Sequence, residues 1–524
     1  MKKERMILTS LLAVLILTNM QAQQITNSPK LVVGVTIDQL RSDYLEAFSA
    51  LYGEKGFKRL LKEGLVYHDV EYSFNDVDRA SAIAAIYSGT PPYYNGIVAD
   101  NWLDRATLRV VNCVDDTKVI GYETLQSSSP RKLSVSTITD ELKVSTNGRG
   151  LVFSFSPFRE AAVFSAGHAA DGAFWLDDDN GRWCGTSYYG NFPFWITSYN
   201  DQSKPDKRIK SIAWTPWADA NDVTLQKNRN ADFKYVFSDA KGKVRFKTSP
   251  LVNDEVNNIV GQCLQNTEIG ADSISDFLSV NYYGGCFDHK SFSDSPEEMK
   301  DVYIRLDRDI AELLDLVDKK VGLKNTLFFV TSTGFNDQES INDIYRIPTG
   351  EFNIKRCTAL LNMYLMAIYG DGQYVDAYHG NQIYLNHKLI EQKHLNLTEI
   401  MNRSSEFLIQ VQGIKDVYTS RRLQFDACIP EISRIKNGYN TQISGDITLI
   451  INSGWKFVDP DKTEQPTVRN SFVEFPLIFF GANVKSDNYF QTVTTDYIAP
   501  TLAHCMRIRA PNACRVSPLA ISRR

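Results

Sequence analysis

Short apolar segments recur along the chain, and amphipathic helical patterns lie between them. The first segment, Leu31 to Ile37, is a continuous run of mostly β-branched residues, which is typical of a strand buried on both faces. The clearest helical pattern runs from Pro296 to Val321 and places its apolar residues on one face. This alternation predicts an α/β fold with a doubly wound, mostly parallel central sheet and helices on both faces. The other strand-like segments are Val152 to Phe155, Phe277 to Val280, Thr326 to Thr331, Ile447 to Ile451 and Leu477 to Phe480.

Two regions break this rhythm. Residues 175–217 are rich in aromatic residues, Gly, Asn and Pro, and predict a loop-rich excursion over the edge of the sheet. Residues 353–422 alternate strand and helix patterns and predict an inserted, smaller α+β subdomain. The core then comprises residues 23–352 and, after the insertion, residues 423–524. The aromatic side chains from Phe174 to Trp195 have two interpretations: a surface for sugar rings or a partner peptide, or the packed interior of the excursion.

The N-terminus has the composition of a cleaved secretory signal. A basic start is followed by an apolar stretch from Met6 to Thr18 and by Ala22 before the expected cut, so residues 1–22 are predicted to be a signal peptide. The stretch is too short to cross a bilayer and no later apolar run reaches spanning length, so we expect a periplasmic or secreted protein that does not span a membrane. The formal net charge of −5 argues against a nucleic-acid partner, because such proteins carry a clustered basic face.

Cysteine spacing gives no sign of a zinc ribbon or a redox dithiol. The chain has 8 cysteines and no C-x-x-C pair. In an oxidising compartment some cysteines can form disulfides, and Cys505 and Cys514 are the closest couple in sequence. The alternative is that most of them are buried as small apolar residues.

The segment from Tyr72 to Trp102 combines a helix start with a tight stop. Asp78 or Ser81 can cap a helix whose small-residue run extends from Ala80 to Ser88, and Gly89 ends it. A helix N-terminus beside a parallel sheet attracts anions, because its free N–H groups and its dipole point at whatever lies in front of it. Asp38 follows the first strand directly, at the sheet edge where doubly wound folds build their sites.

These segments resemble those of a known enzyme family. VVGVTIDQLRSDYL and IYSGTPPYYNGIVADNWLDR are similar to stretches of the alkaline phosphatase superfamily, specifically of the PafA-like periplasmic phosphomonoesterases, and the likeness runs from about Lys30 to about Leu519. The resemblance implies two zinc ions held by Asp and His, a nucleophilic Thr, and Asn, Lys and Arg side chains around the phosphoryl oxygens. In-line phosphoryl transfer needs these parts together, because the nucleophile must be deprotonated and the phosphoryl charge neutralised.

Alignment with this family predicts a degenerate member. Two positions of the metal site keep a ligand type, Asp38 and His289, whereas the nucleophile's position holds Arg79. The other positions that would bind zinc or the phosphoryl group carry unsuited residues. The replaced metal ligands are Gly285, Thr333, Gly334 and Glu474, and the phosphate-binding positions fall on Asp100, Phe158 and Glu160, or on Arg159 after a one-residue shift.

We therefore expect a secreted, catalytically inactive pseudophosphatase without a cofactor, whose retained fold serves binding or assembly with an unknown envelope protein or a glycan. Arg79 is expected to pair with Asp38, Asp100 or Glu474 and so to take the place of a metal cation. The alternative for Arg79 is that it points to solvent.

Two other functions stay open. One is an active phosphoesterase or other hydrolase with a remodelled site, in which Asp38, Asp76, Asp78 and Asp100 hold a single divalent cation and Ser81 replaces the nucleophile. Against it, acidic residues before a helix are usually caps. The other is a structural subunit of an envelope assembly.

The histidines His168, His379 and His387 are expected to be structural.

Overall fold

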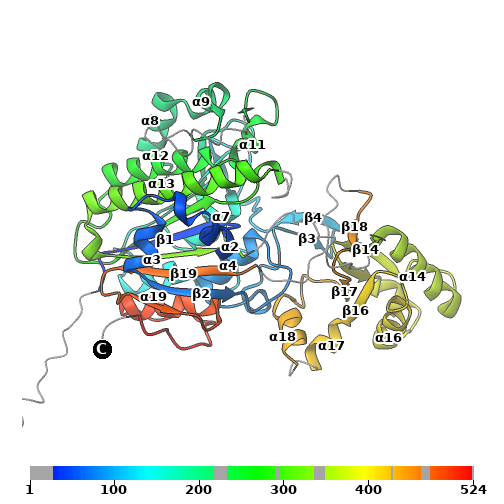
Figure 1. Cartoon of the computed structure of the whole chain (residues 1–524). Coiled ribbons are helices and arrows are strands. Elements are labelled where there is room, and N and C mark those ends of the chain that lie inside the picture. Colours follow the sequence, from blue (N-terminus) through cyan, green and yellow to red (C-terminus); the bar gives the residue numbers. More distant parts are fainter. Residues whose placement is uncertain are drawn as a thin grey trace, which may run out of the picture.

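The computed structural model describes residues 28–217, 233–289, 295–334, 349–425, 429–461 and 473–521, and the predicted signal peptide lies outside them. Its largest feature is an 11-stranded sheet in the order β20-β2-β19-β12-β1-β11-β6-β7-β8-β5, with β21 paired to β2 (Figure 1). These strands are β1 (Leu31–Asp38), β2 (Leu65–Glu71), β5 (Gly121–Tyr122), β6 (Val152–Ser156), β7 (Gly172–Leu176), β8 (Trp183–Thr186), β11 (Asp276–Tyr283), β12 (Thr326–Ser332), β19 (Phe475–Gly481), β20 (Asp487–Tyr489) and β21 (Val493–Thr494).

The centre of this sheet is parallel. β12, β1, β11, β6 and β7 run in one direction, whereas β19 is antiparallel to both β12 and β2. β1 lies in the middle and is buried along its whole length, as its continuous apolar run predicted. The predicted fold class, an α/β fold with a mostly parallel sheet, is confirmed.

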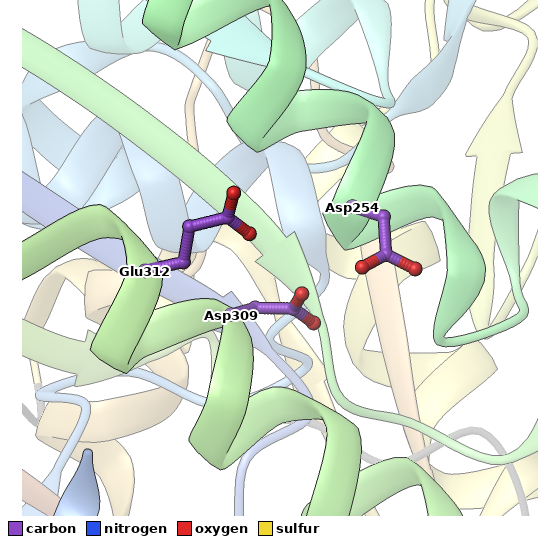
Figure 2. Close-up of side chains that lie close together, drawn as sticks. All are labelled: Asp254, Asp309 and Glu312. Carbon is purple, nitrogen blue, oxygen red and sulfur yellow. The ribbon is translucent and has the colours of Figure 1, made fainter. Parts of the chain in front are cut away.

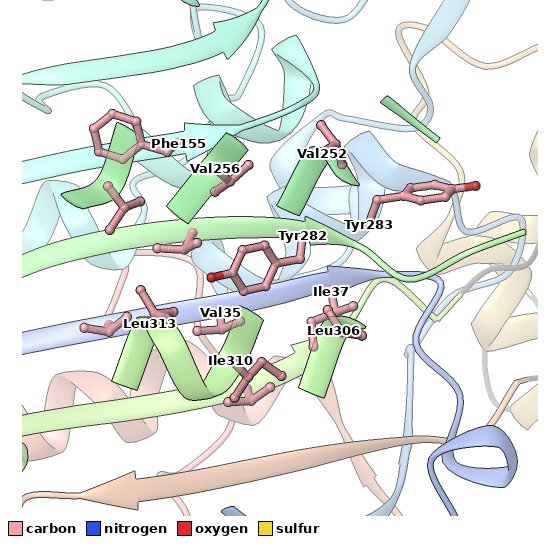
Figure 3. Packing of buried hydrophobic residues seen from close by; sticks show 14 of the residues in the cluster. Val35, Ile37, Phe155, Val252, Val256, Tyr282, Tyr283, Leu306, Ile310 and Leu313 are labelled. Atoms are coloured by element: carbon pink, nitrogen blue, oxygen red, sulfur yellow. The ribbon is translucent and has the colours of Figure 1, made fainter. Parts of the chain in front are cut away.

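Helices cover both faces of the sheet. α12 (Leu251–Asn266) and α13 (Pro296–Lys320) pack on one face, while α4 (Arg79–Ser88), α6 (Ile138–Ser145), α7 (Arg159–Ala166) and α19 (Ile498–Met506) pack on the other. Alternate residues of β1 enter the two cores: Val35 faces α13, and Val32 belongs to the cluster around α4. Figure 3 shows Leu306 and Ile310 of α13 lying against Val35 and its neighbours on the sheet.

The remaining core elements are short and lie around the sheet. They are α2 (Ser42–Ala47), α3 (Phe57–Glu63), α5 (Pro92–Asn95), α8 (Phe194–Ser203), α9 (Pro205–Ser211), α11 (Gly242–Lys247), the pair β3 (Asn101–Asp104) and β4 (Arg109–Asn112), and the pair β9 (Ala213–Trp214) and β10 (Tyr235–Val236). The excursion at 175–217 was predicted to be loop-rich, but it contains α8 and α9. In the aromatic segment from Phe174 to Trp195, the rings of Phe174 and Trp183 are buried beside Phe155, which supports the packed-interior interpretation for these two, whereas Phe194 is exposed.

A second, four-stranded antiparallel sheet lies beside the core (Figure 1). Its order is β14 (Val375–His379), β15 (Gln382–Leu385), β17 (Ile447–Ile451) and β16 (Ile414–Thr419), and α14 (Ile354–Tyr369) and α16 (Leu397–Leu408) share its apolar cluster. α15 (His387–Gln392), α17 (Ser420–Phe425), α18 (Pro430–Asn437) and the pair β13 (Glu351–Asn353) and β18 (Lys456–Val458) complete this region.

One strand lies elsewhere than predicted. Ile447 to Ile451 was assigned to the returning core, but it pairs with β15 and β16 in the smaller sheet. A short apolar run fits either sheet, because both bury such a strand. The domain boundaries themselves stay predictions.

Two further sequence expectations concern thiols and membranes. Cys505 and Cys514 are both free thiols in the structure, so this couple forms no disulfide. Across the described ranges, no helix combines the length and the apolar character needed to cross a bilayer.

Candidate functional site

The start of α4 is fixed by a capping box between Asp78 and Ser81. The Asp78 carboxylate accepts the backbone N–H of Ser81 at 2.9 Å, and the Asp78 N–H donates to the Ser81 hydroxyl at 3.0 Å. The helix ends at Gly89, whose φ of 64° is the left-handed conformation that favours glycine. Both predicted helix limits are thus confirmed. The Ser81 hydroxyl also donates to Asp78 at 2.7 Å, and the residue is fully buried, so this hydroxyl is committed to the cap.

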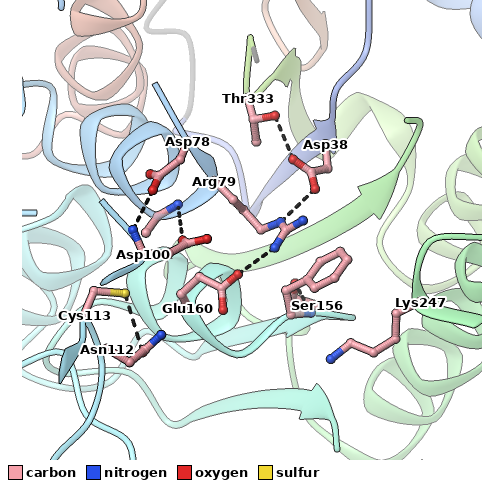
Figure 4. A network of polar contacts seen from close by, with 12 residues as sticks. Asp38, Asp78, Arg79, Asp100, Asn112, Cys113, Ser156, Glu160, Lys247 and Thr333 are labelled. Carbon is pink, nitrogen blue, oxygen red and sulfur yellow. Dashed lines mark hydrogen bonds and ion pairs between the residues drawn. The ribbon is translucent and has the colours of Figure 1, made fainter. Parts of the chain in front are cut away.

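Arg79, the first residue of α4, bridges two carboxylates (Figure 4). Its Nε donates to Asp38 Oδ2 at 2.7 Å, and a terminal nitrogen donates to Glu160 Oε1 at 2.9 Å. The Arg79 side chain is 14% exposed, and those of Asp38 and Glu160 are 4% and 11% exposed. The guanidinium carbon lies 3.5 Å from the centroid of the Phe158 ring, which adds a cation–π contact. The prediction that Arg79 pairs with a carboxylate is confirmed for Asp38.

The two other predicted partners of Arg79 lie differently. Asp100 accepts the backbone N–H of Ala80 at 3.1 Å, and its own N–H donates to Asp78 at 2.5 Å. Asp100 therefore holds the first turn of α4 and acts on Arg79 only through its charge. Glu474 is exposed, and its backbone carbonyl accepts the N–H of Ser42 at 2.9 Å.

The partnership of Arg79 with Glu160 was missed by the sequence analysis. Glu160 lies in the first turn of α7, at the carboxyl end of β6, and was assigned only to a lost phosphate-binding position. The available signal was weak: an acidic residue in the first turn of a helix is common because it complements the helix dipole. Arg159, the alternative phosphate-binding residue, pairs with Asp115 at 3.0 Å.

The second oxygen of Asp38 is occupied by Thr333, one of the replaced ligand positions. The Thr333 hydroxyl donates to Asp38 Oδ1 at 2.8 Å and accepts the backbone N–H of Gln39 at 3.0 Å. Two other replaced positions are tightly enclosed. A Cβ on Gly285 would come within 2.6 Å of Gln39 Oε1, and a Cβ on Gly334 would lie 2.6 Å from the rings of Tyr72 and Phe475. The backbone of His289 lies in a short 3-10 helix, but its side chain is outside the described part of the structure.

The charges in this cluster shift one another's pKa values. Burial alone would lower the pKa of Arg79, but the negative charges of Asp38, Glu160 and Asp100 raise it well above its ordinary value. Burial tends to raise the pKa of Glu160, but the Arg79 charge outweighs this effect and lowers it. Burial, together with the charges of Asp78 and Glu160, raises the pKa of Asp100 well above its ordinary value. The guanidinium thus favours the ionised form of Glu160, whereas burial and the neighbouring carboxylates disfavour the ionised form of Asp100.

The carboxylates proposed to hold a single cation do not gather at one point. Among the described residues, one group of three acidic, His or Cys ligands has its ligand atoms within 4.8 Å of one another, and it lies elsewhere, at Asp254, Asp309 and Glu312. Asp76 is exposed and accepts a hydrogen bond from Asn381 of the smaller-sheet region at 3.2 Å.

A large cleft opens beside the start of α4. Its volume is about 1040 Å³, and its walls come from the Asp78–Val110 segment and from the region of the smaller sheet. Its charged side chains are mostly acidic: the lining includes one lysine, Lys355, and the carboxylates of Asp78, Asp100, Asp376, Asp459 and Asp461. Lys355 already pairs with Asp461 at 3.3 Å.

Two of the three histidines predicted to be structural contact a carboxylate, and the third lies in the cleft. His168 contacts the carboxylate of Asp140 at 2.9 Å, and His387 contacts that of Asp446 at 2.9 Å, which agrees with the structural roles predicted for both. His379 lines the cleft, which its sequence neighbourhood did not indicate.

The family model of type I phosphodiesterase / nucleotide pyrophosphatase matches residues 32–474. The chain belongs to this family. Within the alkaline phosphatase superfamily it is PafA-like, as the sequence motifs predicted. This type I phosphodiesterase family member is 29% identical to the alkaline phosphatase PafA of Elizabethkingia meningoseptica, over 97% of this chain and 98% of the relative. It is 28% identical to the alkaline phosphatase PhoV of Synechococcus elongatus, over 92% of this chain and 91% of the relative.

The structural comparison agrees with the sequence comparison. The crystal structure of wild-type PafA matches the chain with a TM-score of 0.81 and 29% identity, over 94% of this chain and 99% of PafA. The core and the smaller-sheet region are therefore both shared with that relative. The roles that the alignment assigns to single positions stay predictions.

Proposed function

We propose that this family member is a catalytically inactive pseudophosphatase of the periplasm or the extracellular space, which uses the retained cleft to bind a ligand. The observation that carries the proposal is the position of Arg79. It stands at the start of α4, where the family places its nucleophile, and it pairs with Asp38 and Glu160. A guanidinium stays protonated and cannot attack phosphorus, so the position at the start of α4 supplies no nucleophile.

The residues at the aligned zinc positions do not fit two zinc ions. Zinc needs several His, Cys or carboxylate ligands around each ion. Gly285 and Gly334 offer no side chain, Thr333 donates its hydroxyl proton to Asp38, and Glu474 is exposed. Asp38 itself already binds Arg79 and Thr333 through its two oxygens.

The charge of the cleft also disfavours a phosphate ester. Its lining carboxylates outnumber its one lysine, and a phosphate group would be repelled by them. Uncharged polar side chains of Asn362, Gln373 and Tyr378 lie on the same walls, and each also forms hydrogen bonds within the chain. We propose a glycan as the ligand, with a segment of an envelope protein as the alternative.

The decisive experiment is a phosphatase assay on the purified mature protein with a generic aryl phosphate, with and without added zinc, together with its metal content. We expect no turnover above buffer and less than one zinc per chain. The control is Asp38→Asn, which removes the retained ligand, so any turnover that persists in this variant comes from a contaminating enzyme. Saturable turnover that needs Asp38, with about two zinc ions bound, would refute the proposal. A mature N-terminus at Gln23, read by mass spectrometry, tests the secretion part separately.

A further inference from the structure

A second acidic cluster lies between α12 and α13, on the face of the sheet opposite α4. Asp254 lies in the first turn of α12, and Asp309 and Glu312 are one turn apart on α13. Their ligand atoms lie within 4.8 Å of one another, and Figure 2 shows the Asp309 carboxylate between the other two. Asp254 and Glu312 are exposed, so the cluster opens to solvent.

Asp309 forms the buried base of this cluster. The residue is 3% exposed, and its buried Oδ2 accepts no hydrogen bond from a described donor, while its carboxylate lies within hydrogen-bonding reach of that of Asp254. An ionised carboxylate is costly to bury unless a donor or a cation compensates it. Figure 2 shows this carboxylate directed toward Asp254. Two carboxylates attract each other only when a proton or a cation lies between them, because both are otherwise hydrogen-bond acceptors.

The nearby arginines are engaged elsewhere. Arg305 pairs with Asp301 at 2.7 Å, and Arg308 lies over the ring of Trp217 at 3.6 Å. Within the described part of the chain, neither Asp254 nor Asp309 nor Glu312 forms an ion pair with a lysine or arginine. Arg208, the third arginine that acts on Asp254, forms its ion pair with Glu255.

The Glu312 side chain is held in place by a buried amide. Asn257 of α12 donates through Nδ2 to Glu312 Oε2 at 3.3 Å and to the backbone carbonyl of Asp309 at 2.9 Å. The buried Tyr282 hydroxyl donates in turn to the Asn257 side-chain oxygen, which fixes the orientation of that amide. In many proteins a metal-binding carboxylate is oriented by such a hydrogen bond from a residue that does not itself contact the metal.

We propose that Asp254, Asp309 and Glu312 bind one calcium ion, which joins α12 to α13. The ligands are all carboxylate oxygens, which suit a hard cation, and zinc would need nitrogen or sulfur ligands for comparable affinity. Calcium accepts 6–8 oxygens in flexible geometry, so water can complete its shell at the exposed mouth. In the absence of a cation, burial and the neighbouring charges raise the pKa of Asp309, so a proton is the competing occupant.

Calorimetric titration of calcium into the chelator-treated full-length protein, with thermal unfolding alongside, tests the proposal. We expect one calcium per chain and a melting temperature that rises with calcium. Asp309→Asn should weaken binding at least tenfold and remove the calcium-dependent shift. This variant should fold, because its amide can donate to Asp254 as a protonated Asp309 would. The control is Asp315→Asn on the same helix, whose carboxylate pairs with Lys55 at 3.5 Å and which should bind calcium like the wild type.

Three results would overturn the proposal. The first is no calcium binding by the wild type at millimolar calcium, which would leave the proton as the occupant. The second is binding by Asp309→Asn that stays within twofold of the wild type. If Asp309→Asn does not fold, the exposed Glu312→Gln variant takes its place, and unchanged binding by it has the same meaning. The third is loss of binding in Asp100→Asn, which would place the ion at the start of α4 instead. None of these outcomes depends on whether the protein is a phosphatase.

Discussion

The two acidic clusters of this protein differ in what compensates their charge. At the start of α4, Arg79 lies between Asp38 and Glu160 and supplies the positive charge from within the chain. Between α12 and α13, the described residues contribute three carboxylates and no cationic partner. Both clusters meet the same physical demand, because a buried carboxylate needs a donor, a proton or a cation to compensate its charge. A permanent guanidinium makes a site independent of solution ions, whereas an open cluster of acids makes stability depend on them.

Removing the internal cation should have the largest effect. Arg79→Met keeps an unbranched but shorter side chain and removes the cation that pairs with Asp38 and Glu160, while Asp38 keeps its hydrogen bond from Thr333. Because two buried carboxylates then lack their cation, we expect a loss of about 3–5 kcal/mol in the free energy of unfolding, measured with urea. The control is Arg59→Met, which breaks the partly exposed pair between Arg59 and Glu63 and should cost less than about 1 kcal/mol. Equal losses in the two variants would mean that the Arg79 bridge contributes no more than a surface pair.

The sequence predicted the first of these clusters better than the second. The central strand and the cap and stop of α4 followed from local patterns: an apolar run, a capping residue and a glycine. The pairing of Arg79 with Asp38 followed from the resemblance, which aligned both residues with positions of the family's metal site. Glu160 lies 81 residues from Arg79, and their contact depends on how α7 packs beside α4. No local sequence pattern predicts a contact between residues so far apart in the chain.

The α12–α13 cluster was missed for a related reason. In the helical pattern from Pro296 to Val321, Asp309 follows Leu306 by three residues and precedes Leu313 by four, so it borders the apolar face, a signal that was not used to predict a site. However, Asp254 comes from another helix, and its approach depends on the crossing of the two helices. Strand Ile447–Ile451 shows the same limit, because its sequence fixes burial but not which of two sheets buries it.

Adding a positively charged side chain to the Asp254–Asp309–Glu312 cluster should compensate its charge from within the chain, as Arg79 does at the start of α4. Glu312→Lys replaces one exposed carboxylate with an ammonium near Asp254 and Asp309. In the absence of calcium we expect the free energy of unfolding to rise by about 0.5–1 kcal/mol, because one like-charge contact is removed and an opposite charge is gained. The melting temperature should also stop responding to calcium. Glu312→Gln is the control: it removes the like-charge contact without adding an opposite charge, so it should lose the calcium response and gain less stability than Glu312→Lys. A melting temperature of Glu312→Lys that still rises with calcium would contradict the expected similarity of the two clusters.

The smallest effect is expected for Asp100→Asn, which tests whether the first cluster holds more acid than its one guanidinium can neutralise. Because the pKa of Asp100 is raised above the ordinary value of 3.8, the folded state binds a proton more tightly than the unfolded state. Wild-type stability should therefore fall as the pH rises from about 4 through the folded pKa, and the neutral amide lacks this loss. At pH 4 the two proteins should agree within about 0.5 kcal/mol, because the amide oxygen can still accept the N–H of Ala80. In urea unfolding from pH 4 to pH 8, the free energy of unfolding of the variant should therefore increase relative to that of the wild type as the pH rises. A constant difference across that range would mean that Asp100 is already ionised beside Arg79, and that one guanidinium compensates all the carboxylates around it.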